Sequence, residues 1–104
     1  MNKKLNPRVA IIIPAYNESQ TIGKVIETVS KYGMPIVIND GSTDETELIA
    51  MSKRALVVSM KTNKGYDNAI AVGISKAIGN QFDYAITFDA DGQHDSLKIT
   101  EFVR

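Results

Sequence analysis

Four short apolar segments, separated by stretches with helical spacing, constrain the fold of this chain more than any other feature of its sequence. The first segment, 9–13, is a continuous apolar run rich in β-branched residues, which is typical of a strand covered on both faces. The other expected strands are 36–38, 55–58 and 84–88. Because strands that alternate with helices pair in parallel through right-handed crossovers, we expect an α/β fold of three layers around a mainly parallel sheet.

Between these segments, apolar residues recur at the spacing of a helix face. The first helix is expected from residues at i, i+3, i+4 and i+7, namely Ile22, Val25, Ile26 and Val29. Its start is predicted by the capping-box spacing of Asn17 and Gln20, with Ser19 as an alternative N-cap. Gly33 and Pro35 are expected to end it.

Three further helices are predicted in the same way. Ser42 and Glu45 again have capping-box spacing, and they open a helix that carries Leu48, Ile49 and Met51. Gly73 is expected to let the third helix approach a neighbour closely; the apolar stripe of that helix is Ile70, Ile74, Ala77 and Ile78. A last helix is expected after Ser96, over residues 97–103.

Composition limits the classes of function. The 104 residues fit one domain, 1–104, and the 12 basic and 12 acidic residues cancel, so nothing favours nucleic acid or an anionic membrane as a partner. The absence of cysteine excludes disulfides and thiolate metal sites. The longest fully apolar run, 9–13, is far too short to cross a bilayer, and a cytoplasmic protein is the default expectation.

Two carboxylates, Asp89 and Asp91, follow the last expected strand, 84–88. Such a strand end delivers hard anionic oxygens to one rim of a sheet, which suits Mg²⁺ or Mn²⁺ shared with substrate phosphates. The same spacing also occurs in solvated turns, and this alternative stays open for the motif alone. An EF-hand is excluded, because counting from Asp89 places Gly92 at loop position four instead of six and Thr100 instead of Glu at position twelve.

The ends of the first two expected strands are also polar, and ligands of open parallel sheets bind beyond the carboxyl ends of strands. Tyr16, beside a carboxylate, either contacts a base or packs locally. Asp40 is expected to keep a carboxylate that accepts hydrogen bonds from a ligand, because Gly41 and Ser42 account for the turn. Lys64 either faces a phosphate, together with the N-terminus of the third helix, or is a surface lysine.

Two common nucleotide-binding signatures are absent: there is no Gly-x-Gly-x-x-Gly after the first strand and no Gly-x-x-x-x-Gly-Lys-Ser/Thr. Dinucleotide oxidoreductases and P-loop nucleotide hydrolases are therefore disfavoured. A nucleotidyltransferase would be expected to carry a glycine-rich, basic loop after the first strand, and residues 14–18 are neither. The single histidine, His94, fits a structural or solvated side chain better than a metal ligand.

Taken in order, four segments resemble the N-terminal half of an inverting family 2 nucleotide-sugar glycosyltransferase with the GT-A fold. They are 13–18, 39–44, 63–65 with Ala69 and Gly73, and 89–94. Each motif is weak alone, but their order and spacing make the resemblance specific, and it covers nearly the whole chain from Val9 onward. The run Asp-Ala-Asp-Gly-Gln-His is similar to that of dolichyl-phosphate or polyprenyl-phosphate mannosyl- and glucosyltransferases.

The resemblance implies a role for each matching residue. The base and ribose would be lined by Pro14, Ala15, Tyr16 and Glu18. Asp40 would hydrogen-bond the base edge, and Lys64 would lie near the nucleotide. The remaining nucleotide contacts would be Asp89, Ala90 and Asp91. The ligands of a divalent metal, Mg²⁺ or Mn²⁺, would be Asp89, Asp91 and Gln93. This metal would neutralise the charge that develops on the departing nucleoside diphosphate.

The implied activity is transfer of a hexose from a UDP- or GDP-sugar to a lipid phosphate or a saccharide. A polyprenyl-phosphate acceptor would place the full-length enzyme peripherally at a membrane. The catalytic base is expected beyond Arg104, so the 104 residues alone are expected to be inactive. Asp95 departs from the family pattern, which often has proline there. The alternative is an inactive fragment that binds nucleotide or self-associates, and an assay of sugar-nucleotide turnover separates the two.

The strand expected at 84–88 is predicted to leave one edge of the sheet unpaired. No proline or lysine interrupts this segment, and Ile86 and Phe88 are apolar, so the edge would recruit another strand. The helix expected over 97–103 would add an apolar face. A homo-oligomer is therefore expected.

Overall fold

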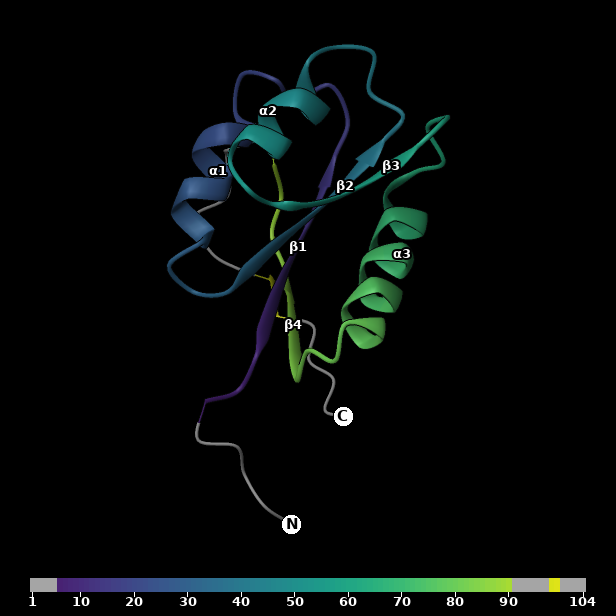
Figure 1. The fold of residues 1–104 in the computed structure, drawn as a ribbon. Coiled ribbons are helices and arrows are strands. Elements are labelled where there is room, and N and C mark those ends of the chain that lie inside the picture. Colours follow the sequence, from purple (N-terminus) through teal and green to yellow (C-terminus); the bar gives the residue numbers. More distant parts are fainter. Residues whose placement is uncertain (1–5, 91–97, 100–104) are drawn as a thin grey trace.

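The computed structural model describes residues 6–90 and 98–99, which form a five-stranded sheet in the order β3-β2-β1-β4-β5. Strands β1 to β4 are parallel, and β5 is antiparallel to β4. Helices α1 and α2 cover one face and α3 covers the other (Figure 1). This confirms the predicted three-layer α/β fold. The elements are β1 (Val9–Ala15), α1 (Ile22–Val29), β2 (Met34–Asp40), α2 (Thr46–Ser52), β3 (Leu56–Met60), α3 (Tyr66–Gly79), β4 (Tyr84–Thr87) and β5 (Lys98–Ile99).

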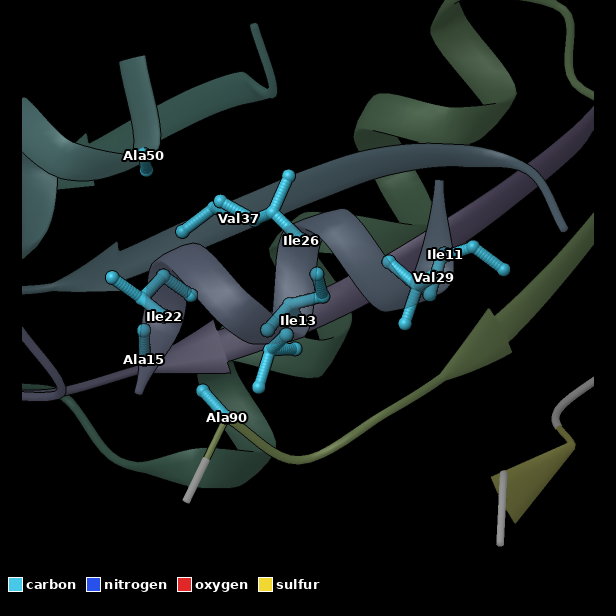
Figure 2. Packing of buried hydrophobic residues seen from close by; sticks show 10 residues of the cluster. Ile11, Ile13, Ala15, Ile22, Ile26, Val29, Val37, Ala50 and Ala90 are labelled. Atoms are coloured by element: carbon cyan, nitrogen blue, oxygen red, sulfur yellow. The ribbon is translucent and has the colours of Figure 1, made fainter. Parts of the chain in front are cut away.

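The central strand β1 is covered on both faces, which explains its continuous apolar run. Ile11 and Ile13 belong to the cluster beneath α1 and α2, whose other members include Ile22, Ile26, Val29, Val37 and Ala50 (Figure 2). Ile12 belongs to the cluster on the opposite face, with Ile36, Ile38, Ala69, Ala77 and Phe82. These two cores fix the sheet between its helices and leave the carboxyl ends of the strands to carry polar residues.

Helix α3 lies directly against the sheet at Gly73, as the sequence predicts. A Cβ atom built on Gly73 would lie 2.3 Å from Cγ2 of Ile12, which is fully buried. Only a residue without a side chain permits this approach. The contact sets the distance between α3 and β1. It therefore also sets the position of the N-terminus of α3 at the carboxyl ends of the strands.

Substituting Gly73 with alanine is expected to destabilise the protein by about 1–3 kcal/mol, because the added methyl group overpacks the core. Gly79→Ala is the matched control in the same helix, since a Cβ there meets nothing within 4 Å. We expect its unfolding free energy to change by less than about 0.5 kcal/mol. Urea denaturation of both variants measures the difference, and equal midpoints would contradict the tight contact.

The predicted capping boxes are wrong. Helix α1 has Thr21 as its N-cap, without a side-chain cap, and Asn17 adopts a left-handed φ of 52° in the preceding loop. Helix α2 begins at Thr46, whose N–H donates to Oδ1 of Asp44 at 2.9 Å. The side chains of Asn17 and Ser42 bond across to the neighbouring loop instead of capping their own helices. Helix α1 also ends before Pro35. This proline lies inside β2, because its fixed φ suits extended backbone.

The helix predicted over 97–103 is wrong where the chain is described, because Lys98–Ile99 form β5. Ile99 pairs with Ile86 and Lys98 pairs with Thr87, so the edge of β4 expected to be unpaired has a partner there. Helical spacing misleads in this segment because the exposed backbone groups of β4 reward an extended partner. The rest of 97–103 lies outside the described residues.

Candidate functional site

A pocket of about 390 Å³ lies beyond the carboxyl ends of β1, β2 and β4. The chain leaves β1 toward β2 on one side and returns to β4 on the other, so the strand order reverses at β1. Ligands of doubly wound sheets bind at such a switch point. The lining residues are Pro14, Ala15, Tyr16, Glu18, Asp40, Asn63, Gly65, Tyr66, Ala69, Asp89 and Ala90.

Seven of the predicted site residues meet in this pocket: Pro14, Ala15, Tyr16, Glu18, Asp40, Asp89 and Ala90. Lys64 does not line it, although its neighbours Asn63 and Gly65 do. Asp91, Gln93 and His94 lie outside the described residues. The strands therefore bring together three separate loops that the sequence singled out.

Asp40 connects the end of β2 to the loop before α3. The residue is 4% exposed, and its carboxylate oxygens accept the N–H groups of Lys64 and Gly65, each at 2.8 Å. The expectation that the turn leaves this carboxylate free for a ligand is therefore wrong. Gly41, at φ 77°, passes so close to the same loop that a Cβ would lie 2.5 Å from the backbone N of Asn63. Asp40 shapes the pocket wall by holding this loop.

Asp89 is approached by Tyr66, a residue the sequence interpretation missed. Tyr66 begins α3, and its hydroxyl lies 3.5 Å from Oδ1 of Asp89. Burial raises the pKa of Tyr66, and the Asp89 charge raises it further, so the hydroxyl keeps its proton and donates. The available signal was an aromatic residue directly after the polar loop, at the first position of a helix.

The loop that carries Asp89 is also held from the opposite face of the sheet. The hydroxyl of Thr21, at the start of α1, donates to the backbone carbonyl of Ala90. Ala90 is itself buried in the cluster beneath α1, where Figure 2 shows it below Ile13. Contacts from α1 and α3 thus converge on Asp89 and Ala90, which follow β4.

Asp44 lies beside the pocket and is strongly hydrogen-bonded. The hydroxyl of Thr46 is the main cause that lowers the pKa of Asp44 to about 2, and the N–H groups of Thr46 and Ser19 act in the same direction. These donors favour the ionised carboxylate.

This bonding predicts an acid-dependent stability. The pKa of Asp44 is about 2 in the folded protein and 3.8 ordinarily. Its contribution to folding stability is therefore complete above pH 3.8 and is lost as pH falls through about 2. The unfolding free energies of the wild type and Asp44→Asn should therefore converge as pH is lowered from ~5 to ~2. Urea titrations at several pH values measure this, and a constant gap between the two proteins would contradict it.

With the pocket and its loops placed, comparison with known proteins identifies the family. The family model described as Glycosyl transferase family 2 matches residues 10–104. The chain belongs to this family. It is 32% identical over 106 residues to the uncharacterized protein MJ1222 of Methanocaldococcus jannaschii, in a match that covers 100% of this chain and 44% of that protein.

A second relative is the UDP-N-acetylglucosamine–dolichyl-phosphate N-acetylglucosaminyltransferase of Methanococcus voltae. It is 35% identical over 115 residues, which cover 92% of this chain and 46% of the relative. Among solved structures, glucosyl-3-phosphoglycerate synthase from Mycobacterium tuberculosis in complex with Mn²⁺ and UDP-glucose matches with a TM-score of 0.67 and 28% identity. That match covers 82% of this chain and 33% of the synthase.

These similarities confirm the GT-A fold and the family 2 membership that the four motifs predicted. This chain spans less than half of the length of each of the two sequence relatives and about a third of the synthase. The residues that carry the match include the three loops at the pocket, because the family model begins at Ala10 and runs through all of them.

Proposed function

We propose that this chain forms the donor-binding part of a metal-dependent, inverting glycosyltransferase. The reaction transfers a hexose from a UDP- or GDP-sugar to a lipid phosphate or a saccharide hydroxyl. The single observation that carries the proposal is the pocket at the switch point, where Tyr16, Glu18, Asp40 and Asp89 converge. The family 2 match and the Mn²⁺ and UDP-glucose in the related synthase support it.

The nucleotide is assigned to the pocket by the chemistry of its walls. Pro14, Ala15 and Tyr16 offer an apolar and aromatic surface to a base, and the Glu18 carboxylate suits ribose hydroxyls. Asp40 reaches the base edge with the acceptor capacity that remains after its two backbone bonds, since each carboxylate oxygen accepts more than one donor. Lys64 lies near the nucleotide on the loop that Asp40 holds.

The same pocket fits a divalent metal at one end. Asp89 presents a carboxylate there, and hard oxygen ligands suit Mg²⁺ and Mn²⁺. Within 6–90, no cluster of three or more His, Cys, Asp or Glu side chains forms a complete metal cage. Asp91, Gln93 and the donor phosphates are assigned to the remaining positions. When bound, the metal supplies Lewis-acid stabilisation of the departing diphosphate.

A polyprenyl-phosphate acceptor is the finer part of this proposal. It rests on the dolichyl-phosphate acceptor named for the Methanococcus voltae relative. In the part of the chain that is described, no helix has the length and apolarity needed to cross a membrane. We place the full-length enzyme in the cytoplasm, peripheral to the membrane that holds its acceptor.

Self-association remains part of the proposal, although β5 partners Ile86 and Thr87 on the edge first considered for it. The remaining support is exposed apolar surface on α2, where Leu48 is 68% and Met51 is 57% exposed. Sedimentation of the chain at high micromolar concentration tests this. A monomer would overturn it.

Metal-dependent nucleotide binding is the expected result that tests the proposal. Calorimetry of UDP and of GDP should give tighter binding to this chain in Mn²⁺ or Mg²⁺ than in EDTA. The nucleotide that binds more tightly identifies the base of the donor. Equal affinity with and without metal, for both nucleotides, would overturn the metal-dependent assignment, and no binding of either would overturn donor binding itself.

A further inference from the structure

Three consecutive backbone amides in the loop after β1 donate to side chains of the loop after β2 and of the first residue of α2. The N–H of Asn17 donates to Oγ of Ser42 at 2.9 Å, and that of Glu18 to Oγ1 of Thr46 at 2.9 Å. The N–H of Ser19 donates to Oδ2 of Asp44 at 3.2 Å. This segment, 17–19, belongs to the loop that forms part of the pocket wall: Glu18 lines the pocket, and so does Tyr16 directly before the segment.

Thr46 is the centre of this arrangement. It is fully buried, and its hydroxyl accepts the N–H of Glu18 while it donates to Oδ1 of Asp44. A charged acceptor, a hydroxyl and a backbone amide thus form one chain of hydrogen bonds, which polarise one another. Valine has the shape of threonine but provides neither the donor nor the acceptor.

The backbone conformation of this loop is also unusual. Asn17 lies between the two pocket-lining residues Tyr16 and Glu18 and has φ 52°, in the left-handed region that few residues other than glycine adopt, asparagine more often than most. Its Oδ1 in turn accepts the N–H of Thr43 at 2.8 Å. The two loops therefore exchange hydrogen bonds in both directions, and the unusual turn directs the side chains on either side of it.

We propose that Asp44 and Thr46 are positioning residues for nucleotide binding, which fix Glu18 and the turn at Asn17 in the conformation that places Tyr16 and Glu18 on the pocket wall. Neither residue lines the pocket. They act through the backbone of 17–19. This inference rests on the proposed donor-binding function and assigns to that site a set of residues outside the pocket itself.

The test compares Thr46→Val with Thr46→Ser in this chain. UDP and GDP affinities are measured in Mn²⁺ by calorimetry, and amide hydrogen exchange is followed at 17–19. Thr46→Val is expected to weaken binding about 5- to 30-fold and to speed exchange of the Glu18 amide, because this partly buried donor loses its acceptor. Thr46→Ser keeps the hydroxyl and should restore both properties to near wild-type values.

Ser52→Ala is the matched control, because it removes a hydroxyl from the same helix that bonds only to the carbonyl of Ile49 among the contacts described. It should change neither binding nor exchange at 17–19. If Thr46→Val does not fold, Asp44→Asn takes its place. Asp44 is exposed, and the substitution replaces one oxygen acceptor of the Ser19 or Thr46 bonds by an amide donor.

Wild-type affinity in a folded Thr46→Val, or in Asp44→Asn where that variant is used, would overturn the positioning role. Failure of the wild type to bind either nucleotide would overturn the proposed function instead. Hydrogen exchange would then decide the structural part independently: unchanged exchange at Glu18 in Thr46→Val overturns the hydrogen-bond chain, and faster exchange supports it.

Discussion

Replacing Asp40 with alanine is expected to remove a large part of the stability of this domain and to abolish nucleotide binding. The buried carboxylate accepts two backbone N–H groups, and hydrogen bonds to charged groups contribute about 1.5–3 kcal/mol each. The expected loss is therefore roughly 3–6 kcal/mol, against a total stability of about 5–15 kcal/mol for a typical domain. Urea denaturation measures the loss, and calorimetry with UDP or GDP measures binding.

Two comparisons make the Asp40 result specific. Asp40→Asn keeps the side-chain volume but turns an N–H donor toward one of the two backbone donors, so it should also be clearly destabilised. Glu27→Ala removes an exposed carboxylate that bonds Lys53 on the surface, and it should have a much smaller effect. If Asp40→Ala were as stable as Glu27→Ala, the loop at 63–65 would not depend on Asp40.

The layer structure could be predicted from the sequence because its cause is local. The run at 9–13 is apolar on both sides of the strand, and the stripe at Ile22, Val25, Ile26 and Val29 has one buried face. Each pattern states which surfaces must be covered. The positions of Pro14, Asp40 and Asp89 at one rim then follow from the parallel direction of their strands.

The errors share a different physical cause, which is competition from distant partners. Asn17 and Ser42 are residue types that favour helix caps, but their side chains accept backbone N–H groups of the neighbouring loop instead. The segment 97–103 has helical spacing, but at Lys98–Ile99 the edge of β4 offers a strand partner. Tyr66 was missed because its significance depends on Asp89, which lies 23 positions later in the chain.

The predicted position of Asp89 at the pocket agrees with the structure, whereas the backbone partners of Asp40 were not predicted, for a related reason. A sequence shows that a polar residue follows a strand, but it does not show which donors reach that residue. The loop at 63–65 folds back over β2, and its two N–H groups occupy Asp40. Such loop-to-loop bonds determine whether a carboxylate at a strand end faces a ligand or the protein.

Asp89→Asn is expected to eliminate the enhancement of nucleotide binding by Mn²⁺ while leaving the affinity in EDTA nearly unchanged. The substitution keeps the volume and one oxygen but removes the negative charge that a hard divalent cation requires. Loss of even the outer partners of a metal site costs about 10–100-fold, so the affinity in Mn²⁺ should fall by at least that order. Calorimetry with UDP and GDP, in Mn²⁺ and in EDTA, gives the four affinities needed.

Asp67→Asn is the matched control for Asp89→Asn. It also neutralises a carboxylate beside Tyr66, in the first turn of α3, but Asp67 is exposed and does not line the pocket. Its metal enhancement should equal that of the wild type, because a long-range charge effect on the pocket is screened in solution while a direct ligand is not. An undiminished enhancement in Asp89→Asn would place the metal away from the end of β4. An equal loss in both variants would attribute the enhancement to the net charge around Tyr66 instead of to coordination by Asp89.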